Sequence, residues 1–115
     1  MQIINKSKEI LIAQRGKLAN TFFTRMMGLL NRDSIDPDEA LIIIPCKSIH
    51  MFFMRFPIDV VFVDKELKVV GMVENIQPFR LSPTYRKAGF AIELAVGSVQ
   101  RLQIQIGDSI QIIDE

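Results

Sequence analysis

Several residue types and patterns are rare or missing in the 115-residue sequence. It contains one cysteine, one histidine, one tyrosine and no tryptophan. A single cysteine allows no disulfide within the chain, which is typical of proteins from a reducing compartment. No run of about 18 apolar residues is present, so no membrane-spanning helix is expected. The N-terminal sequence, MQIINKSKEILIAQR, lacks the charged start and long apolar region of a secretory signal peptide. We therefore expect a cytoplasmic protein.

Clustered charge of one sign is also absent. The chain has 14 basic and 13 acidic residues and a formal net charge of +1, and the two signs are interspersed. Nucleic-acid-binding domains usually concentrate lysine and arginine on one face or helix, so no nucleic-acid partner is expected. The sequence also lacks the G-x-S-x-G motif of hydrolases, the H-E-x-x-H motif of metalloproteases and any strong metal-ligand spacing. We predict no catalytic residue, no metal and no cofactor.

Short hydrophobic segments are what the sequence does contain. Hydrophobic residues make up 49% and charged residues 23%, as in a folded domain, and the length indicates a single domain over residues 1–115. Segments rich in β-branched or aromatic residues predict strands, at 2–13, 40–45, 48–54, 57–64, 68–76, 90–96 and 102–112. Repeated strand–helix units are missing, which argues against a doubly wound parallel sheet. We predict a mainly β (α+β) fold, in which a small antiparallel sheet is partly closed and barrel-like, with one amphipathic helix near residues 20–30.

The helix is predicted from the segment ANTFFTRMMGLLNRD. Asn20 or Thr21 can cap it, and a glycine at position 28 often permits close backbone approach. Apolar residues cover one broad face at helical spacing: Phe22, Phe23, Met26, Met27, Leu29 and Leu30. Arg25 and Arg32 flank Gly28 on the other side, where two guanidinium groups can receive a carboxylate or a phosphate. The alternative is a solvated helix face with ion pairs to nearby aspartates.

The segment CKSIHMFFMRFPIDVVFVD holds the only cysteine and the only histidine of the chain, Cys46 and His50. A thiolate–imidazole pair needs hydrogen-bond contact, but residues four apart in an extended strand are separated by about 13 Å. With Asp59 and Asp64 the two residues could converge on a metal ion, although their spacing matches no strong metal motif. We favour a simpler interpretation, in which the thiol is buried and the histidine lies in or at the edge of the core.

Two carboxylates interrupt apolar segments that are predicted to be buried strands. Asp59 lies in PIDVVFVD, and Glu93 lies in FAIELAV. An ionised carboxylate in a buried strand is unfavourable unless a partner compensates it. For Asp59 the candidate partners are arginine side chains, His50 or backbone N–H groups, and a structural clamp is the main alternative to a place in a binding cleft. The two carboxylates could also form a general acid/base pair if their environments differed.

A long loop completes the candidate site. The segment QPFRLSPTYRKAG is stiffened by two prolines and places Arg80 beside Phe79. Long loops in small domains are often functional. We predict a cleft between the helix at 20–32, the strands at 48–64 and the loop at 77–89. Its ligand-binding residues would be Arg25, Arg32, His50, Asp59 and Arg80.

These residues lead to one leading hypothesis and two alternatives. The leading hypothesis is a non-catalytic small-ligand-binding or accessory domain, whose partner is an unknown small molecule or protein. One alternative is a hydrolytic enzyme that uses His50 with an acidic residue. The other is a protein-interaction module that pairs through an exposed strand edge. The sequence leaves open the oligomeric state, and whether Cys46, His50 and Asp59 are functional or structural.

Several blocks of the sequence, in order, resemble a known family. The block TRMMGLLNR is similar to an Arg–x–x–Gly–Leu–Met–x–Arg motif, and SIHMFFMRFPIDVVFVD, QPFRLSP, AIELAVG and IGD are similar to later blocks. The family consists of prokaryotic domains catalogued as domain of unknown function number one hundred and ninety-two. The resemblance implies a compact, mainly β domain with a short helix and implies no activity. The family's pattern falls on Arg25, Gly28, Arg32, Asp59, Asp64, Glu93, Gly97, Gly107 and Asp108.

Two features set this chain apart from many of the relatives it resembles. The sequence C-x-S-I-H, with Cys46 and His50, is similar to a variant found in a subset of the family. Many relatives carry Met-Lys-Asn-Thr where this chain has Met54, Arg55 and Phe56. Some relatives look exported or lipid-anchored, but no such leader is visible here, which agrees with the expected cytoplasmic location.

Overall fold

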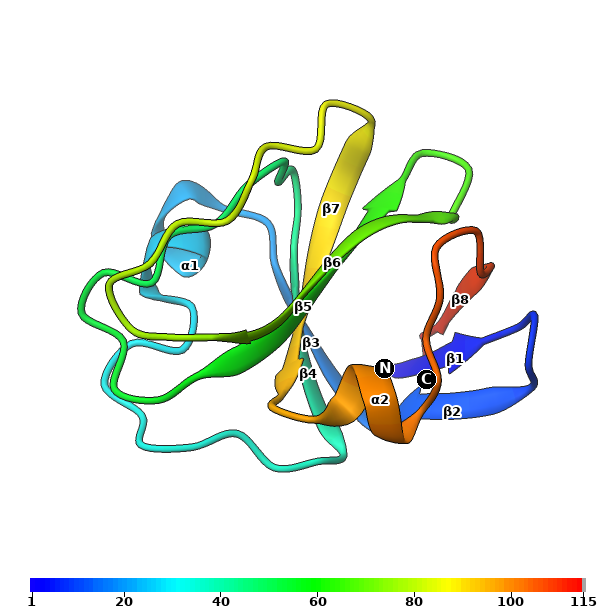
Figure 1. The fold of residues 1–115 in the computed structure, drawn as a ribbon, viewed down its shortest axis with the longest axis horizontal. Helices are drawn as coiled ribbons and strands as arrows, with labels where there is room; N and C mark the ends of the chain where they lie inside the picture. Colours follow the sequence, from blue (N-terminus) through cyan, green and yellow to red (C-terminus); the bar gives the residue numbers. More distant parts are fainter. Residues whose placement is uncertain (115) are drawn as a thin grey trace.

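The computed structural model describes residues 1–114, apart from the side chains of Phe22, Phe23 and Met26. Within that part of the chain, the strands are β1 (Gln2–Asn5), β2 (Ile10–Ala13), β3 (Arg15–Ala19), β4 (Glu39–Ile43), β5 (Ile58–Asp64), β6 (Val69–Ile76), β7 (Ala88–Ala95) and β8 (Ile110–Ile113), and the helices are α1 (Phe22–Met27) and α2 (Ser98–Arg101). The predicted mainly β fold is confirmed (Figure 1). Neither helix of the described chain is long and apolar enough to cross a membrane.

The strands form two sheets. A five-stranded sheet has the order β3-β4-β7-β5-β6, and a three-stranded sheet has the order β2-β1-β8. Neighbouring strands are antiparallel except β3 and β4, which run parallel and are joined by a crossover that contains α1. The sheets are not closed into a barrel, which corrects the barrel-like closure predicted from the sequence. Closure fails because β1 and β8 pair in their own sheet, which leaves β3 and β6 as edges of the larger one.

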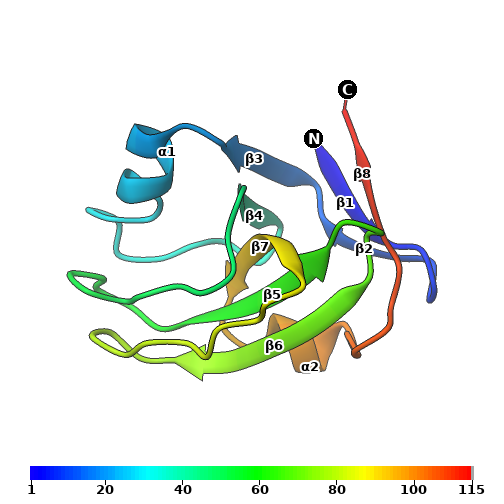
Figure 2. The ribbon, with the colours of Figure 1, turned by 90° about the horizontal axis from the view of Figure 1, so that it is seen from above.

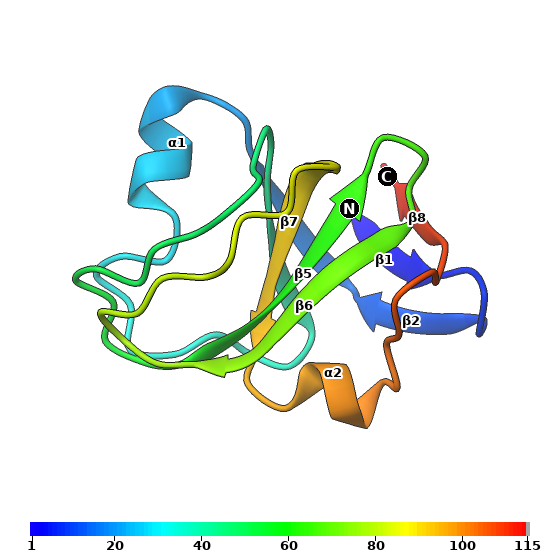
Figure 3. The same cartoon turned by 45° about the horizontal axis from the view of Figure 1, so that its top comes forward.

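The five-stranded sheet separates two hydrophobic clusters, because successive residues of a strand point to opposite faces. On one face, Ile42 and Ile92 pack with residues from the three-stranded sheet and α2. On the other face, Leu41 and Val60 pack against the loop at 45–57 and the turn after α1. Figures 2 and 3 show α1 at one end of the molecule and the three-stranded sheet at the other. The face toward α1 is therefore covered largely by loops.

Helix α1 is capped at both ends but is shorter than predicted. The Thr21 hydroxyl accepts a hydrogen bond from the backbone N–H of Thr24, and the Thr24 hydroxyl accepts one from the N–H of Thr21, both at 3.0 Å. The helix ends at Gly28, whose φ of 42° strains a glycine least. Three side chains of the predicted apolar face lie outside the described part of the chain: Phe22, Phe23 and Met26.

Of the two strands predicted at 48–54 and 57–64, only the second is present, as β5. Residues 45–57 form an irregular loop, in which the Met51 carbonyl accepts hydrogen bonds from the N–H groups of Met54 at 3.3 Å and Phe79 at 2.8 Å. These bonds turn the chain before it can join the sheet. Met51 and Met54 are nevertheless buried. The apolar composition of the loop serves the core, and this is why composition alone suggested a strand.

Two other segments differ from the prediction. Strand β3 was not predicted, since its sequence RGKLA contains no β-branched residue, and it forms through its pairing with β4. The alternating residues 102–106 do not form a strand. They turn back after α2, where the N–H of Ile104 donates to the carbonyl of Val99 at 3.0 Å. The four residues just before this segment form the short helix α2.

Candidate functional site

A pocket of about 430 Å³ opens beside α1, on the loop-covered face of the large sheet. Its walls come from the last turn of α1, the residues just after it, the loop at 45–54, β4 and β7. The walls are mostly apolar and include Leu29, Leu30, Ile43, Ile49 and Met51. The polar groups are Arg25, Cys46, Lys47, Ser48, His50 and Glu93. This volume and this mixture of groups are typical of small-molecule sites.

The register of β7 explains why Glu93 faces the pocket. Glu93 lies between Ala91 and Ala95 on the strand, and both alanines belong to the cluster on the α1 side of the sheet. Residues two apart share a face, so the Glu93 side chain points to the same side. Its neighbours across the sheet are Leu41 of β4 and Val60 of β5. The carboxyl group is thus held above small side chains and beside apolar ones.

The Glu93 carboxyl has no partner in the described chain. The residue is 7% exposed, and no hydrogen bond or ion pair to its side chain is formed by residues 1–114. Burial raises its pKa to about 7. A buried carboxyl without a hydrogen-bond donor is unusual, because most buried polar groups are satisfied. It resembles the perturbed acids that mark binding and catalytic sites.

Two cations line the same pocket but are held by backbone carbonyls. The Arg25 guanidinium donates through Nε to the carbonyl of Thr21 and through Nη1 to the carbonyl of Pro45, each at 3.3 Å. These bonds fasten α1 to the start of the 45–57 loop. The Lys47 ammonium donates to the carbonyls of Arg86 at 2.6 Å and Ala88 at 2.9 Å. Neither cation is bonded to Glu93.

Cys46 and His50 also line the pocket, but they form no dyad. The Cys46 thiol donates to the carbonyl of Ser48 at 3.2 Å. Burial raises the pKa of this thiol, and the nearby charge of Glu93 raises it further, whereas the positive charge of Arg25 lowers it. The His50 ring stacks on Phe52 with a centroid separation of 5.1 Å. Within residues 1–114, no three Cys, His, Asp or Glu side chains are grouped so that they could hold a metal ion.

The rim of the pocket continues into an exposed apolar patch, which consists of Phe52, Phe53, Phe79 and Leu81. The Phe53 and Phe79 side chains are 76% and 62% exposed, and their rings meet edge to face at 6.1 Å. Both residues have positive φ values, of 65° and 66°, which bulky side chains rarely adopt. A bridge between His50 and Leu81 joins the two loops. Apolar patches of this kind often border binding sites.

Of the five residues predicted from the sequence, Arg25 and His50 line the pocket. Asp59 lies elsewhere: it is 0% exposed and pairs across the sheet with Leu94, on the α2 side. Its carboxylate accepts hydrogen bonds from the N–H groups of Asn75 at 2.8 Å and Val99 at 2.9 Å. Since Asp59 and Glu93 point to opposite faces of the sheet, the acid/base pair considered from the sequence cannot form.

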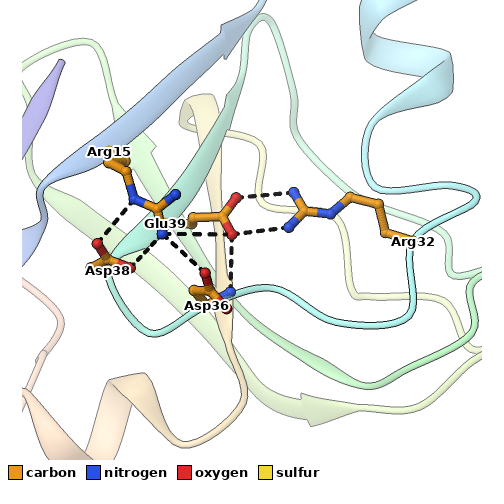
Figure 4. Close-up of polar contacts among 5 residues, drawn as sticks. All are labelled: Arg15, Arg32, Asp36, Asp38 and Glu39. Carbon is orange, nitrogen blue, oxygen red and sulfur yellow. Dashed lines mark hydrogen bonds and ion pairs between the residues drawn. The ribbon is translucent and has the colours of Figure 1, made fainter.

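Arg32 is engaged in an ion pair outside the pocket. Its two Nη atoms donate to the two carboxylate oxygens of Glu39 at 2.9 and 3.0 Å. The hydrogen bond from Arg32 is the main cause of the lowered pKa of Glu39. Figure 4 shows Arg15 on the other side of the same carboxylate, where it also binds Asp36 and Asp38. Arg32 thus fastens the loop before β4 and contributes to structure.

Arg80 does not line the pocket either. Its side chain is exposed, while its backbone carbonyl accepts a hydrogen bond from the N–H of Met51 at 2.8 Å. This bond holds the loop before β7 against Met51, which lines the pocket. The predicted cleft therefore includes the helix and the 48–54 part of the chain, whereas no residue of the 77–89 loop lines the pocket itself.

Glu93 was not among the predicted binding residues, although its position in a strand was noticed. Its flanking alanines were the usable signal. Residues two apart on a strand share a face, so Glu93 has a small alanine on each side of it on that face. Small neighbours leave room beside the charged side chain, which can become part of a pocket. The missing information was the identity of the neighbours on the pocket side.

The chain is similar to known proteins over nearly its whole length. Residues 3–112 match the family model DUF192, described as Uncharacterized ACR. A UPF0127 protein of Thermococcus sibiricus is 38% identical over 94% of this chain and 72% of its own length. A UPF0127 protein of Pyrococcus abyssi is 35% identical over 95% of both chains.

A solved structure shows the same fold. The crystal structure of a protein of unknown function from Novosphingobium aromaticivorans superposes with a TM-score of 0.83 and 23% identity, and the match covers 96% of this chain and 82% of that one. The resemblance expected from the sequence blocks is confirmed, and the chain belongs to the DUF192 family of uncharacterised proteins.

Proposed function

We propose that this chain is a non-catalytic small-ligand-binding domain, and that its ligand occupies the pocket beside α1. The observation that carries the proposal is the buried carboxyl of Glu93, which has no partner among residues 1–114 and lies in the wall of an apolar pocket of about 430 Å³. Concave apolar sites with a few converging polar groups are the usual places for small ligands. A ligand that donates a hydrogen bond would satisfy the carboxyl.

A second observation supports the same pocket. Arg25 and Lys47 are anchored to backbone carbonyls from α1, the 45–57 loop and the segment before β7. These bonds connect the elements that surround the opening, so the walls are held in place before a ligand arrives. Preorganised walls favour binding because less conformational entropy is lost.

The test is a ligand screen read by thermal shift and by two-dimensional NMR. A library of small apolar fragments, each with one polar group, is added to wild type, Cys46→Phe and Cys46→Ser. A ligand specific for the folded state raises the melting temperature as its concentration exceeds Kd. We expect hits for wild type and Cys46→Ser and none for Cys46→Phe, whose larger side chain fills the pocket. Hits that persist unchanged in Cys46→Phe, or no hits in wild type, would contradict the proposal.

A hydrolytic enzyme is the second candidate, because Cys46, His50 and Glu93 line one pocket. It is the weaker candidate, since the thiol bonds to the carbonyl of Ser48 and the imidazole stacks on Phe52. Nucleophilic catalysis needs a nucleophile and a base within hydrogen-bond reach. A panel of ester, thioester and amide substrates with wild type and His50→Ala decides between the two. Turnover that disappears in a folded His50→Ala variant would favour the enzyme.

The cytoplasmic location expected from the sequence belongs to the same proposal. Its support is the single cysteine, which is free in the structure and lines the pocket. A free thiol is more readily maintained in a reducing compartment. Fractionation of cells of the source organism with an antibody against the chain tests it, and recovery in the membrane or secreted fraction would contradict it.

A further inference from the structure

The unpartnered carboxyl of Glu93 also indicates which chemistry the ligand carries. We propose that the pocket selects ligands in which an apolar body bears a protonated primary amine, and that the ammonium group pairs with Glu93. This inference rests on the proposed binding function and names the ligand class. The amine can belong to a free small molecule or to a lysine side chain, and both present the same group.

The Glu93 carboxyl has a defined position in the fold. Glu93 lies on β7, the central strand of the five-stranded sheet, between strands β4 and β5. Its backbone is fixed by pairing with Leu41 and Val60. The side chain is 7% exposed, and the exposed part faces the pocket. The backbone of Glu93 is therefore fixed in the pocket wall, and its carboxyl lies where a ligand in the pocket can reach it.

No cation of the described chain compensates the Glu93 carboxyl. The charged or titratable groups that line the pocket are Arg25 on α1 and Cys46, Lys47 and His50 on the 45–57 loop. None of them forms an ion pair or a hydrogen bond with Glu93 among residues 1–114. The facing strands contribute only the apolar Leu41 and Val60.

The environment of the carboxyl indicates the chemistry of a suitable partner. A carboxyl in an apolar site is compensated best by a group that carries both a positive charge and N–H donors. An ammonium group offers three donors on a compact charge. The apolar walls, with Leu29, Ile49 and Met51, would contact the remainder of the ligand. An alcohol can donate one hydrogen bond but brings no charge, and a carboxylate would repel the ionised Glu93.

The pH dependence of binding follows from the same pairing. Burial raises the pKa of Glu93 in the free protein to about 7, and an alkylammonium stays protonated well above that pH. Between pH 6 and pH 8 the ionised fraction of Glu93 rises from roughly one-tenth to nine-tenths. The affinity for an amine should therefore increase about tenfold over this range, whereas that for an alcohol should not increase.

The experiment uses three probes with the same apolar body: 2-phenylethylamine, 2-phenylethanol and phenylacetate. Their affinities for the full chain are measured by NMR titration at pH 6 and pH 8. Glu93→Gln keeps the size of the side chain and removes its charge, and Glu74→Gln is the control, since Glu74 is exposed on the edge strand β6. A fourth probe is a lysine-containing peptide whose α-amino terminus is acetylated and whose side-chain ε-amine is free. It shows whether a protein lysine can supply the amine.

We expect wild type and Glu74→Gln to bind the amine most tightly at pH 8, with the tenfold rise from pH 6, and Glu93→Gln to lose both the preference and the rise. Binding of the peptide would identify a lysine side chain as a source, and binding of the free amine alone a small molecule. Equal or tighter binding of the alcohol or phenylacetate by wild type at pH 8 would overturn the ligand class and leave the pocket function intact. Binding of none of the probes would overturn the ligand class, and the fragment screen would then decide the function separately. If Glu93→Gln fails to fold, the pH profile of wild type alone decides.

Discussion

Asp59 and Glu93 lie on neighbouring strands of one sheet, both buried, at positions one step apart in the register. Asp59 faces α2 and accepts hydrogen bonds from two backbone N–H groups, those of Asn75 and Val99. Glu93 faces the opposite way, into a pocket, and among the described residues no group donates to it. The N-cap residue of α2 is Gly97, which has no side chain to accept a hydrogen bond from the first turn. Asp59 of β5 provides this acceptor, because it binds the N–H of Val99, the second residue of the helix.

The contrast distinguishes a carboxylate that builds the fold from one that is available to a ligand. Burial is similar for both, so exposure alone does not separate them. Partners do: a satisfied buried acid stabilises the native state, whereas an unsatisfied one destabilises it until something binds. The account therefore predicts opposite effects when each carboxylate is removed.

The largest effect is expected for Asp59→Ala. The substitution leaves the buried N–H of Val99 and the partly exposed N–H of Asn75 without their acceptor. A buried charge-assisted bond contributes about 2 kcal/mol and the more exposed one at most as much, so the free energy of unfolding should fall by about 3 to 4 kcal/mol. Asp59→Asn, which keeps one acceptor, should lose about half as much. Urea denaturation followed by circular dichroism measures both. A loss below about 1 kcal/mol for Asp59→Ala would mean that the clamp contributes little.

Glu93→Gln should raise the free energy of unfolding at neutral and alkaline pH and leave it unchanged at acidic pH. Burial raises the pKa of Glu93 from 4.5 to about 7, so the folded state favours the neutral acid. The contribution of Glu93 to the free energy of unfolding should then fall as the pH rises from 4.5 through 7, by about 3 kcal/mol in total. Glu93→Gln should lack this fall and be more stable at pH 8 and equally stable at pH 4. Denaturation curves at the two pH values test this, and a destabilised variant at pH 8 would contradict it.

A third carboxylate, Glu39, extends the comparison to an acid satisfied by a side chain. Arg32→Gln should lower the free energy of unfolding at pH 7 by about 1.5 kcal/mol, since Arg32 is half-exposed and solvent weakens the pair. The pKa of Glu39 is lowered in the folded state, so this contribution exists above its unfolded pKa and disappears as the pH falls through the folded value. The loss should therefore be smaller at pH 3. The control is Arg55→Gln, whose pair with Asp33 is exposed and should matter little.

The smallest effect concerns how the two helices begin. Helix α1 is capped by its own Thr21, whereas α2 depends on Asp59. Thr21→Ala should reduce stability by about 1 kcal/mol, less than the loss of the Asp59 clamp. Ser34→Ala, at an exposed loop position, serves as the control. Thermal denaturation of both variants is sufficient, and a Thr21→Ala effect as large as that of Asp59→Ala would remove the distinction between local and distant capping.

Much of the fold could be predicted because hydrophobic patterning and turn residues are local signals. Strands β5 and β6 stood out through their β-branched residues and β7 through its apolar segment, and Thr21 was recognised as a possible cap. Strand β3 could not be recognised, because RGKLA forms a strand only through its parallel pairing with β4. The segment 48–54 was mistaken for a strand because apolar side chains fill a core equally well from an irregular backbone.

The candidate site was predicted less completely, for a physical reason. The sequence indicated that Asp59 and Glu93 each needed a partner, and Asp59 has two. Which face of the sheet each residue occupies depends on register, and a shift of one residue reverses the faces. Arg32 met Glu39 across the loop before β4, a pairing that depends on tertiary structure. Only the assembled sheet shows that, of the two buried acids Asp59 and Glu93, Glu93 is the one without a partner in the described chain.

Titration of Glu93 tests most directly whether this carboxyl is buried without a partner and available to a ligand. The carboxyl carbon of this residue, assigned by comparison with Glu93→Gln, is followed by carbon-13 NMR from pH 4 to pH 9. We expect the titration of the Glu93 carboxyl to have its midpoint at about pH 7, because burial raises its pKa and no group among residues 1–114 pairs with it. A midpoint near the ordinary value of 4.5 would show that the carboxylate is solvated or already satisfied, and the claim that it awaits a ligand would be contradicted.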